Sequence, residues 1–532
     1  MNYRLLADIT LAVLLGVVPL HADELQHEIY DLAEMNRGTG PRFVRHSPNN
    51  EANPRVMPDG EIQVYYSGGR KGPKTLLITS KDGGRTWSKP RLAFEDGQTW
   101  QYPRRTLVDR NGNLHMLIFR VETLDVLHTM STDRGRTWSK KKEIAKGYIG
   151  AIRAFIQCKS GRLVFAFHRV IRKHKTAGPT GGCGISSVYS DDNGKTWKQS
   201  TSWVLAPCFK NANDNNYGAV EPNIIQLKDG RLWMLCRTQT GKLYEAYSLD
   251  EGETWSTGKP SVFHSTSSPP NLLRLPDGRM VLCWSNNSQP SLGVFGKIYV
   301  NREALHMAIS EDDGLTWRGF REVYLNPLRN GGRDAYGKRG DFGTSYPTMD
   351  FTKQGKIILA TGQGHDERHR AIFLVDPKWL YETERAEDFS NDMRNLSAYT
   401  FIGKEGVVRP RFLGPTIVAH PEDRKQGVML LARPDAKYAP NAAVWNFPLA
   451  RKGKLTLDLC RNRGAAPLEL ALTDHHSHPN DTEARKAAMI RLDVADVLQI
   501  EEGAWSQIQI AWDLDKNQCR ASCGGREVRV EV

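Results

Sequence analysis

Four residues whose side chains can do acid–base or anion-binding chemistry stand at the ends of repeated sequence units. Glu221 opens and Arg237 closes the unit EPNIIQLKDGRLWMLCRT, Arg302 precedes ALHMAIS, and Tyr346 opens YPTMDFTKQG. The planar fork of arginine pairs bidentately with a carboxylate and does not lose its charge. A phenol beside a carboxylate can give up its proton and act as a nucleophile. Whether these side chains meet depends on the elements that carry them.

Metal chemistry has one candidate in the sequence, the close group His475, His476 and His478. Three neighbouring histidines could bind a metal ion, but a solvated loop is the favoured interpretation, and no HExxH motif or CxxC pair is present. The sequence therefore predicts neither a metal site nor a cofactor.

The eight cysteines would permit disulfides in an exported protein, although spacing alone does not give connectivity. Candidate partners are Cys183 with Cys208, or two of Cys460, Cys519 and Cys523. Cys236 and Cys283 occupy equivalent positions in MLCRT and VLCWS. We expect these last two to be small buried hydrophobic residues rather than disulfide partners.

A unit of two apolar runs joined by a glycine turn occurs six times, a pattern typical of a β-hairpin. The copies begin at Pro54, Pro103, Ile152, Pro222, Pro270 and Pro347.

Between the hairpins, an eight-residue box of the form S-x-D-x-G-x-T-W recurs five times, which indicates an internal repeat. The copies are Ser80–Trp87, Ser131–Trp138, Ser190–Trp197, Ser248–Trp255 and Ser310–Trp317. The Asp carboxylate can accept backbone N–H bonds in a turn in which Gly takes positive φ. The indole can then fill the space between neighbouring sheets.

Five boxes and six hairpins predict an all-β protein built around a six-bladed β-propeller, with one blade carrying a degenerate box. We expect the propeller to cover residues 23–395 and a β-sandwich-like C-terminal domain to cover residues 396–532. A pattern of helical type at Asp376–Glu382 separates the two. A seventh blade starting near Gly414 is the alternative interpretation of the C-terminal part.

Residues 1–22 are typical of a secretory signal, because Arg4 precedes an apolar run and Ala22 is a plausible cleavage point. This predicts a secreted or periplasmic protein, and no later segment has the pattern of a transmembrane helix. The net charge of +13 favours anionic partners. Because no nucleic-acid motif or long Lys/Arg run is present, acidic glycans are favoured over nucleic acid.

The five boxes, the six hairpin units and the signal segment resemble the sialidase (neuraminidase) superfamily over about residues 40–380. The resemblance implies a secreted exo-glycosidase that releases a terminal acidic sugar by a retaining mechanism. It further implies that Tyr346 is the nucleophile, that Glu221 takes its proton, and that Arg237 and Arg302 hold the sugar carboxylate. The boxes lie outside the site in that family, so the function rests on the hairpin ends.

Two groups of the family pattern are missing from their expected places. Glu51 stands where the first clamp arginine is expected, and a shifted register could supply Arg55, or else Arg42 or Arg45. The loop before the first box, residues 67–74, contains no carboxylate to serve as the acid/base aspartate.

The charged loop over residues 329–343 offers Asp334 or Asp341 as a relocated acid, and Glu51 is another candidate. A solvated surface loop is the simpler interpretation of these residues. These departures leave two alternatives open. One is a propeller hydrolase or lyase that acts on another acidic polysaccharide, and the other is a non-catalytic glycan-binding propeller.

Overall fold

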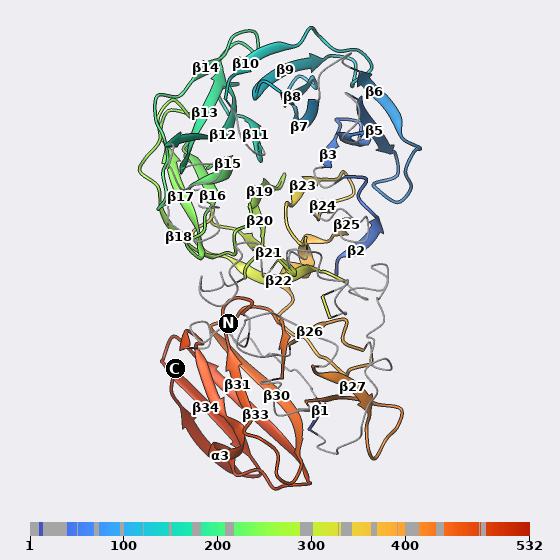
Figure 1. Ribbon diagram of the computed structural model, residues 1–532, viewed down its shortest axis with the longest axis vertical. Coiled ribbons are helices and arrows are strands. Elements are labelled where there is room, and N and C mark those ends of the chain that lie inside the picture. The colour runs from blue at the N-terminus through green and yellow to red at the C-terminus, as the bar shows by residue number, and fades with distance from the viewer. Residues whose placement is uncertain are drawn as a thin grey trace.

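Strands dominate the protein, and they form two lobes joined end to end (Figure 1). The computed structural model describes residues 10–13, 40–49, 52–68, 74–95, 101–120, 122–147, 152–172, 182–207, 218–287, 302–327, 329–330, 343–362, 370–390, 392–399, 414–431, 441–477, 479 and 486–532.

The larger lobe is a ring of six four-stranded antiparallel sheets, which we number as blades 1 to 6. Blade 1 comprises β3 (Asn53–Val56), β4 (Ile62–Ser67), β5 (Lys74–Ser80) and β6 (Arg91–Glu95). Blade 2 comprises β7 (Gln101–Val108), β8 (Leu114–Arg120), β9 (Asp125–Ser131) and β10 (Lys142–Ala145). Blade 3 comprises β11 (Phe155–Gln157), β12 (Leu163–Arg172), β13 (Gly182–Ser190) and β14 (Lys198–Gln199). Blade 4 comprises β15 (Val220–Gln226), β16 (Leu232–Arg237), β17 (Lys242–Ser248) and β18 (Lys259–His264). Blade 5 comprises β19 (Asn271–Arg274), β20 (Met280–Trp284), β21 (Ala304–Ser310) and β22 (Arg318–Leu325). The first strand of each blade lies innermost and contacts the first strands of its neighbours. The predicted six-bladed propeller is confirmed.

The ring closes because blade 6 takes strands from two distant parts of the chain. β23 (Thr348–Phe351), β24 (Ile357–Thr361) and β25 (Ala371–Val375) are joined by the N-terminal strand β2 (Arg42–Arg45). β2 pairs antiparallel with β25 as the outermost strand. Each box lies between the third and fourth strands of its blade, and blade 6 has no such connection in the chain. The expected degenerate sixth box is therefore wrong, and five boxes are what this closure permits.

The third box illustrates how each of these turns is held. Asp192 Oδ1 accepts hydrogen bonds from the Thr196 backbone N–H at 2.8 Å and from the Ser190 hydroxyl at 2.9 Å. The Ser190 hydroxyl accepts the N–H of Gly194 at 2.8 Å, and Gly194 has φ 83°. The bonds from the Thr196 hydroxyl and backbone lower the pKa of Asp192 to about 2. The predicted turn chemistry is confirmed.

The box tryptophans fasten each blade to the one before it. Trp138 of blade 2 meets Tyr65 of blade 1 edge to face at 5.9 Å between ring centroids. Trp255 of blade 4 donates its indole N–H to Ser187 of blade 3 at 2.8 Å. Trp317 of blade 5 packs against blade 4. These large rings fill the wedge between sheets, as the sequence predicted.

A ring of polar side chains ties the innermost strands together. Asn223 on β15 donates to the carbonyl of Arg153 before β11 and accepts the N–H of Leu272 on β19. Asn271 accepts the N–H of Met349 on β23 at 2.9 Å. Because these groups are buried, an unmade bond would leave a costly unsatisfied atom, so the ring fixes the relative height of the blades. This sets the positions of residues at the strand ends.

After β25, the chain forms the short 3₁₀-helix η4 (Pro377–Tyr381), which confirms the predicted change to a helical pattern, and then enters the smaller lobe. Its main sheet has the order β27-β28-β1-β30-β33-β34-β35. These strands are β27 (Thr416–Ala419), β28 (Gly427–Leu430), β1 (Thr10–Val13), β30 (Lys452–Arg461), β33 (Trp505–Asp513), β34 (Gln518–Cys523) and β35 (Arg526–Val530). The remaining elements are β26 (Leu396–Tyr399) paired with β29 (Ala442–Trp445), β31 (Glu469–Leu472) paired with β32 (Ile490–Asp493), and α3 (Val494–Leu498).

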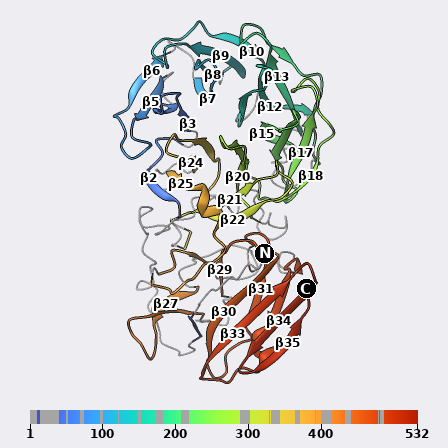
Figure 2. The same ribbon diagram turned by 180° about the vertical axis from the view of Figure 1, so that it is seen from behind.

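This second lobe has its own hydrophobic core, which includes Leu457, Ile508 and Ile510. Gly414 and the strands after it belong to this lobe, so the alternative of a seventh blade is excluded. The lobe lies beside blades 5 and 6 in both views (Figures 1 and 2).

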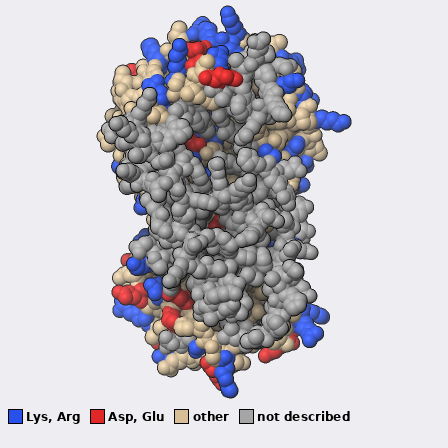
Figure 3. All heavy atoms as spheres, viewed as in Figure 1, with Lys and Arg blue, Asp and Glu red and all other residues tan. Residues whose placement is uncertain are grey.

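The segment predicted as a secretory signal contributes β1, which pairs parallel with β28 and β30. Export stays a prediction. Among the described residues, no helix is long and apolar enough to cross a membrane. On the face shown in Figure 3, the Lys and Arg side chains of the described residues are spread around the edge of both lobes.

The cysteines depart from one expectation and meet another. Cys460, Cys519 and Cys523 carry free thiols, so the expected disulfide among them is wrong. Each lies on a paired strand, where its backbone position is set by the sheet. The alternative pair, Cys183 with Cys208, falls partly outside the described residues. Cys236 and Cys283 are fully buried on β16 and β20, as predicted.

Candidate functional site

One face of the propeller collects the beginnings of the first and third strands and the ends of the second strands, because successive strands are antiparallel. Val220 at the start of β15 pairs with Arg237 at the end of β16. Arg302 stands two residues before β21, and Tyr346 two residues before β23. The repeated hairpins therefore bring four predicted site residues to the same face.

Local backbone conformation aims two of these side chains. The β15–β16 register shifts between Val220 and Asn223, so Glu221 lies in a bulge and has φ 49°. Tyr346 has φ 61°. Left-handed backbone at a non-glycine residue costs about 1–3 kcal/mol and clusters at functional sites. Bulges likewise turn a side chain away from its regular direction. Both strained residues precede a proline and point into one cluster.

Tyr346, Glu221 and Arg237 form a closed triangle of hydrogen bonds. The Tyr346 hydroxyl donates to Glu221 Oε1 at 2.9 Å, and Arg237 Nη1 donates to Glu221 Oε2 at 2.8 Å. The same Arg237 nitrogen lies 3.1 Å from the Tyr346 hydroxyl, to which it donates. All three side chains are buried. The phenol thus has both a proton acceptor and a cation beside its oxygen.

Ser267, in the segment between β18 and β19, holds the two predicted clamp arginines next to each other. Its hydroxyl accepts from Arg237 Nε at 2.9 Å. Its carbonyl accepts from Arg302 Nε at 3.1 Å and also from Arg302 Nη2. The Arg302 guanidinium lies 5.7 Å from the centre of the Tyr346 ring. Arg302 is 1% exposed, so its position is set by these contacts rather than by solvent.

A third arginine, Arg153, completes the cluster and was not found from the sequence. Its guanidinium lies 4.9 Å from the centre of the Tyr346 ring and donates to the Pro347 carbonyl at 2.9 Å. The signal was only partial, because Arg153 stands eight residues before its turn glycine, Gly161, whereas Glu221 and Tyr346 stand nine residues before theirs. A second missed neighbour is His168 on β12, whose Nδ1 accepts the backbone N–H of Glu221 at 3.0 Å.

The charges of the cluster favour the ionised form of Glu221 and the neutral form of Tyr346. Burial works to raise the pKa of Glu221, but Arg237 and Arg153 outweigh it and bring this pKa down to about 2. Burial, and then the Glu221 charge, raise the pKa of Tyr346 despite the opposing effect of Arg237 and Arg302. At neutral pH the pair is therefore a carboxylate and a neutral phenol.

The expected replacements for the first clamp arginine do not reach this cluster. Arg55 lies on β3, but its guanidinium contacts Asp350 at 3.3 Å and Thr106 at 3.3 Å. Arg42 and Arg45 lie on β2, the outermost strand of blade 6. The side chain of Arg55 is expected on the correct face of its strand but at the wrong position along it. Arg55 stands five residues before its turn glycine, Gly60, whereas Glu221 stands nine residues before Gly230.

The three candidate proton donors, Glu51, Asp334 and Asp341, lie outside the described residues. Within the described part of the chain, Glu221 is the carboxylate that hydrogen-bonds both Tyr346 and Arg237.

Two of the three neighbouring histidines after β31 do not lie in the expected solvated loop, and the third, His478, is outside the described residues. His475 and His476 are buried against the propeller, which corrects that interpretation. Among the described residues, His264, Asp474 and His475 place their ligand atoms within 4.8 Å of one another. However, the two imidazoles stack at 4.1 Å with an angle of 7° between their planes. Their lone pairs lie in parallel planes and do not converge on one ion, so we assign no metal site here.

The depressed pKa of Glu221 predicts a specific pH dependence of stability. A carboxyl with pKa 4.5 when unfolded and about 2 when folded contributes stability above pH 4.5 that is lost as the pH falls through 2. Between pH 6 and pH 3, this contribution falls by about 2 kcal/mol. We therefore expect wild type to lose that much more unfolding free energy than Glu221→Gln over this range, measured by urea denaturation. Parallel pH profiles for the two proteins would contradict it.

Comparisons with known proteins agree with the repeat architecture. A family model described as a BNR repeat-like domain matches residues 106–359. A sialidase of Micromonospora viridifaciens is 26% identical over 309 residues, which cover 49% of this chain and 44% of that protein. A sialidase of Paraclostridium sordellii is 27% identical over 227 residues, which cover 39% of this chain and 51% of that protein. The chain thus matches about half of the length of these two relatives.

A solved structure of a mutant of the NanB sialidase of Streptococcus pneumoniae superposes with a TM-score of 0.44 at 14% identity, covering 68% of this chain and 73% of that one. The match over residues 106–359, which run from blade 2 into blade 6, and the similarity to the two curated sialidases support a divergent member of the sialidase superfamily of BNR-repeat proteins.

Proposed function

We propose that the protein is a retaining exo-glycosidase that releases a terminal acidic sugar, of the sialic acid type, from glycans. The observation that carries the proposal is the buried triangle of Tyr346, Glu221 and Arg237. A neutral phenol, hydrogen-bonded to an ionised carboxylate and to an arginine, is arranged to become a nucleophile without carrying a negative charge beforehand. A neutral nucleophile suits an anionic sugar, because its carboxylate would repel a charged one.

The proposed sugar carboxylate binds to an arginine cluster, for which Arg237, Arg302 and Arg153 are the candidates. Arg153 takes the place of the first clamp arginine that is missing near Glu51. The side chains around Tyr346 include three guanidinium groups and one carboxylate, which favours an anionic ligand. The planar forks of these arginines also match the geometry of a carboxylate.

In the first chemical step, the Tyr346 oxygen bonds to the anomeric carbon as the glycosidic C–O bond breaks. The phenolic proton passes to Glu221, and the leaving oxygen takes a proton from an acid, for which Glu51, Asp334 and Asp341 remain the candidates. In the second step, water gives one proton to the conjugate base of that acid and bonds to the anomeric carbon as the tyrosyl C–O bond breaks. Glu221 then returns its proton to the phenol oxygen. Two displacements retain the anomeric configuration.

The proposal is tested by the activity of the full chain on a fluorogenic α-sialoside, with a uronic acid polymer as the contrasting substrate. Release of the fluorophore, with the α-anomer of the free sugar as first product by NMR, is the expected result. A lyase would instead leave an unsaturated sugar that absorbs in the ultraviolet. Ultraviolet absorbance from the polymer without sialoside cleavage would overturn the proposal in favour of that alternative. Glycan binding without turnover of either substrate would favour a binding protein.

Export through residues 1–22 belongs to the same proposal, because sialylated or other acidic glycans are met outside the cytoplasm. The N-terminal sequence of the protein recovered from a secreting host tests it. A mature chain that starts after Ala22 supports export, and retention of residues 1–22 contradicts cleavage.

A further inference from the structure

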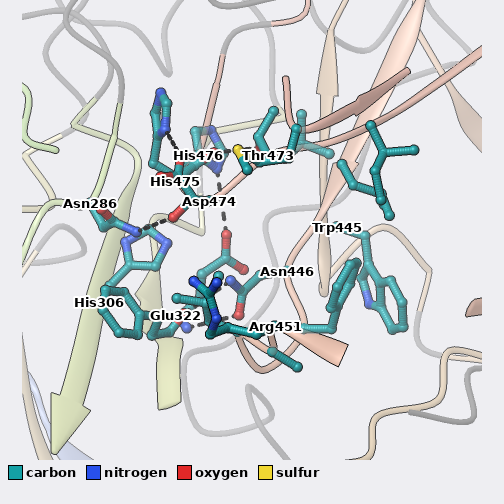
Figure 4. Close-up of a pocket in the computed structure, with 18 of the residues that line it drawn as sticks. Asn286, His306, Glu322, Trp445, Asn446, Arg451, Thr473, Asp474, His475 and His476 are labelled. Atoms are coloured by element: carbon teal, nitrogen blue, oxygen red, sulfur yellow. Dashed lines mark hydrogen bonds and ion pairs between the residues drawn. The ribbon is translucent and has the colours of Figure 1, made fainter. Parts of the chain in front are cut away.

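The C-terminal lobe reaches the same face of the propeller as the site through the segment Asp474–Ser477. The backbone N–H of His476 donates to the Asn286 carbonyl at 2.8 Å, and His476 forms a parallel bridge with Asn287. The Asn286 side chain donates to the Asp474 carbonyl at 3.1 Å (Figure 4). The segment therefore adds a short bridge to blade 5 just beyond the end of β20.

His476 is inserted among polar groups of both lobes. Its Nε2 lies 2.8 Å from the Tyr399 hydroxyl and 4.0 Å from Glu303 Oε1, and its Nδ1 lies 3.5 Å from Glu322 Oε1. Glu303 directly follows Arg302 and is fully buried. One imidazole from the C-terminal lobe thus contacts the residue beside a proposed clamp arginine.

His475 contacts the propeller segment that leads to Ser267, which holds both proposed clamp arginines. Its ring stacks on His264, the last residue of β18. His264 stands three residues before Ser267, whose hydroxyl and carbonyl hold Arg237 and Arg302. Two adjacent histidines of the C-terminal lobe therefore contact two separate propeller segments, and both segments set the positions of the proposed clamp arginines.

The apolar packing between the lobes is incomplete beside these polar contacts. Beside His476 lies a pocket of about 270 Å³, lined by Phe320 of blade 5 and by Trp445, Phe447 and Trp512 of the C-terminal lobe (Figure 4). A gap of this size removes van der Waals contacts that would otherwise fix the lobes to each other. The pocket therefore supplies little packing that would compensate for loss of the His476 contacts.

We propose that Asp474–Ser477 is a positioning element of the glycosidase site, with His476 its central residue. This proposal rests on the proposed function for its kinetic consequence. The segment contacts neither Tyr346 nor Glu221 in the described structure. It acts by holding the stretches that carry Ser267 and Arg302 at the distance the arginine pair requires. Small displacements of such groups are expensive, since a shift of about 1 Å can cost about 100-fold in rate.

The kinetic test compares His476→Ala with wild type on the fluorogenic sialoside. A displaced clamp weakens ground-state and transition-state binding alike, so we expect KM to rise about 10-fold while kcat changes by less than about threefold. A merely misfolded fraction would instead lower kcat and leave KM unchanged. His476→Gln, which can still hydrogen-bond Tyr399, should recover much of the loss. An unchanged KM in His476→Ala would overturn the proposal.

The matched control is His420→Ala. His420 also belongs to the C-terminal lobe and stacks on an aromatic ring, that of Trp505 at 4.8 Å, but it lies beyond the end of β27 within that lobe. Its removal is expected to leave KM unchanged. An equal rise in KM for both variants would show a general effect of destabilising the lobe and would contradict a specific role for His476.

Amide hydrogen exchange separates this proposal from the proposed function, because it requires no activity. In His476→Ala we expect faster exchange in the peptides that cover residues 264–268 and 302–305, and no such change in His420→Ala. If wild type cleaves no sialoside but this exchange pattern appears, the proposed function fails and the positioning role stands. If exchange in both peptides is the same as in wild type, the positioning role fails whatever the activity.

Discussion

Replacing Tyr346 by phenylalanine is expected to lower kcat/KM on a sialoside by about 1,000-fold or more, because the change removes the oxygen that forms the covalent bond. The ring remains, so its contacts with Arg153 and Arg302 are kept. The variant also leaves Glu221 and Arg237 paired with each other at 2.8 Å. We therefore expect it to fold and to bind the acidic sugar while losing turnover. Steady-state kinetics and a direct binding measurement check both parts.

Tyr65→Phe is the matched control for this change. Tyr65 is another buried tyrosine, and its hydroxyl donates a hydrogen bond inside the propeller to Gln63 at 2.9 Å. Its loss is expected to cost about 1 kcal/mol of unfolding free energy and to leave kcat/KM unchanged. Full activity of Tyr346→Phe would exclude Tyr346 as the nucleophile. Similar losses in both variants would show that the effect is structural.

Replacing Arg237 by lysine is expected to lower kcat/KM by about 100-fold, although the positive charge is kept. Arg237 uses separate nitrogens to hold Ser267 and to reach Glu221 with Tyr346. A lysine ammonium cannot occupy both positions at once, because all three of its N–H donors belong to one nitrogen atom. The expected loss combines weaker binding of the sugar carboxylate with weaker support of the Tyr346 oxygen. Both KM and kcat should therefore change.

Arg162→Lys provides a control with the same chemistry on the opposite face. Arg162 holds the carboxylates of Asp191 and Glu253, and its guanidinium lies over the Tyr189 ring at 4.3 Å. It stands next to the turn glycine Gly161, at the far end of the strands from the site. We expect this variant to keep wild-type kinetics. An Arg237→Lys variant with equally normal kinetics would remove Arg237 from the binding site.

The fold could be predicted from the sequence because its signals are local. Each box places its Asp, Gly and Trp within eight residues, and each hairpin carries its own glycine turn. The closure of blade 6 could not be predicted in the same way, since β2 and β25 are separated by more than 300 residues. Their pairing leaves no local pattern, and it is this pairing that removes the sixth box.

The candidate site was predictable where residues stand the same number of residues before the turn glycine of equivalent strands. Glu221 and Tyr346 each stand nine residues before a turn glycine, and the structure brings them to 2.9 Å. Arg55 was placed by strand parity alone, which gives the face of the strand but not the position along it. Arg153 was overlooked because a third arginine was sought only in the first hairpin unit and in the residues just before it. Buried contacts between lobes, such as those of His476, leave no periodic signal in either segment.

The central claim, that Tyr346 becomes bonded to the sugar, is tested most directly by mass spectrometry after incubation with a fluorinated sialic acid analogue. Fluorine beside the anomeric carbon slows the second displacement more than the first when the leaving group is good, so the covalent intermediate accumulates. We predict that the mass of the fluorinated sugar is added to the peptide that contains Tyr346, and that Tyr346→Phe remains unlabelled. Labelling of any other residue, with none on Tyr346, would contradict the proposed mechanism.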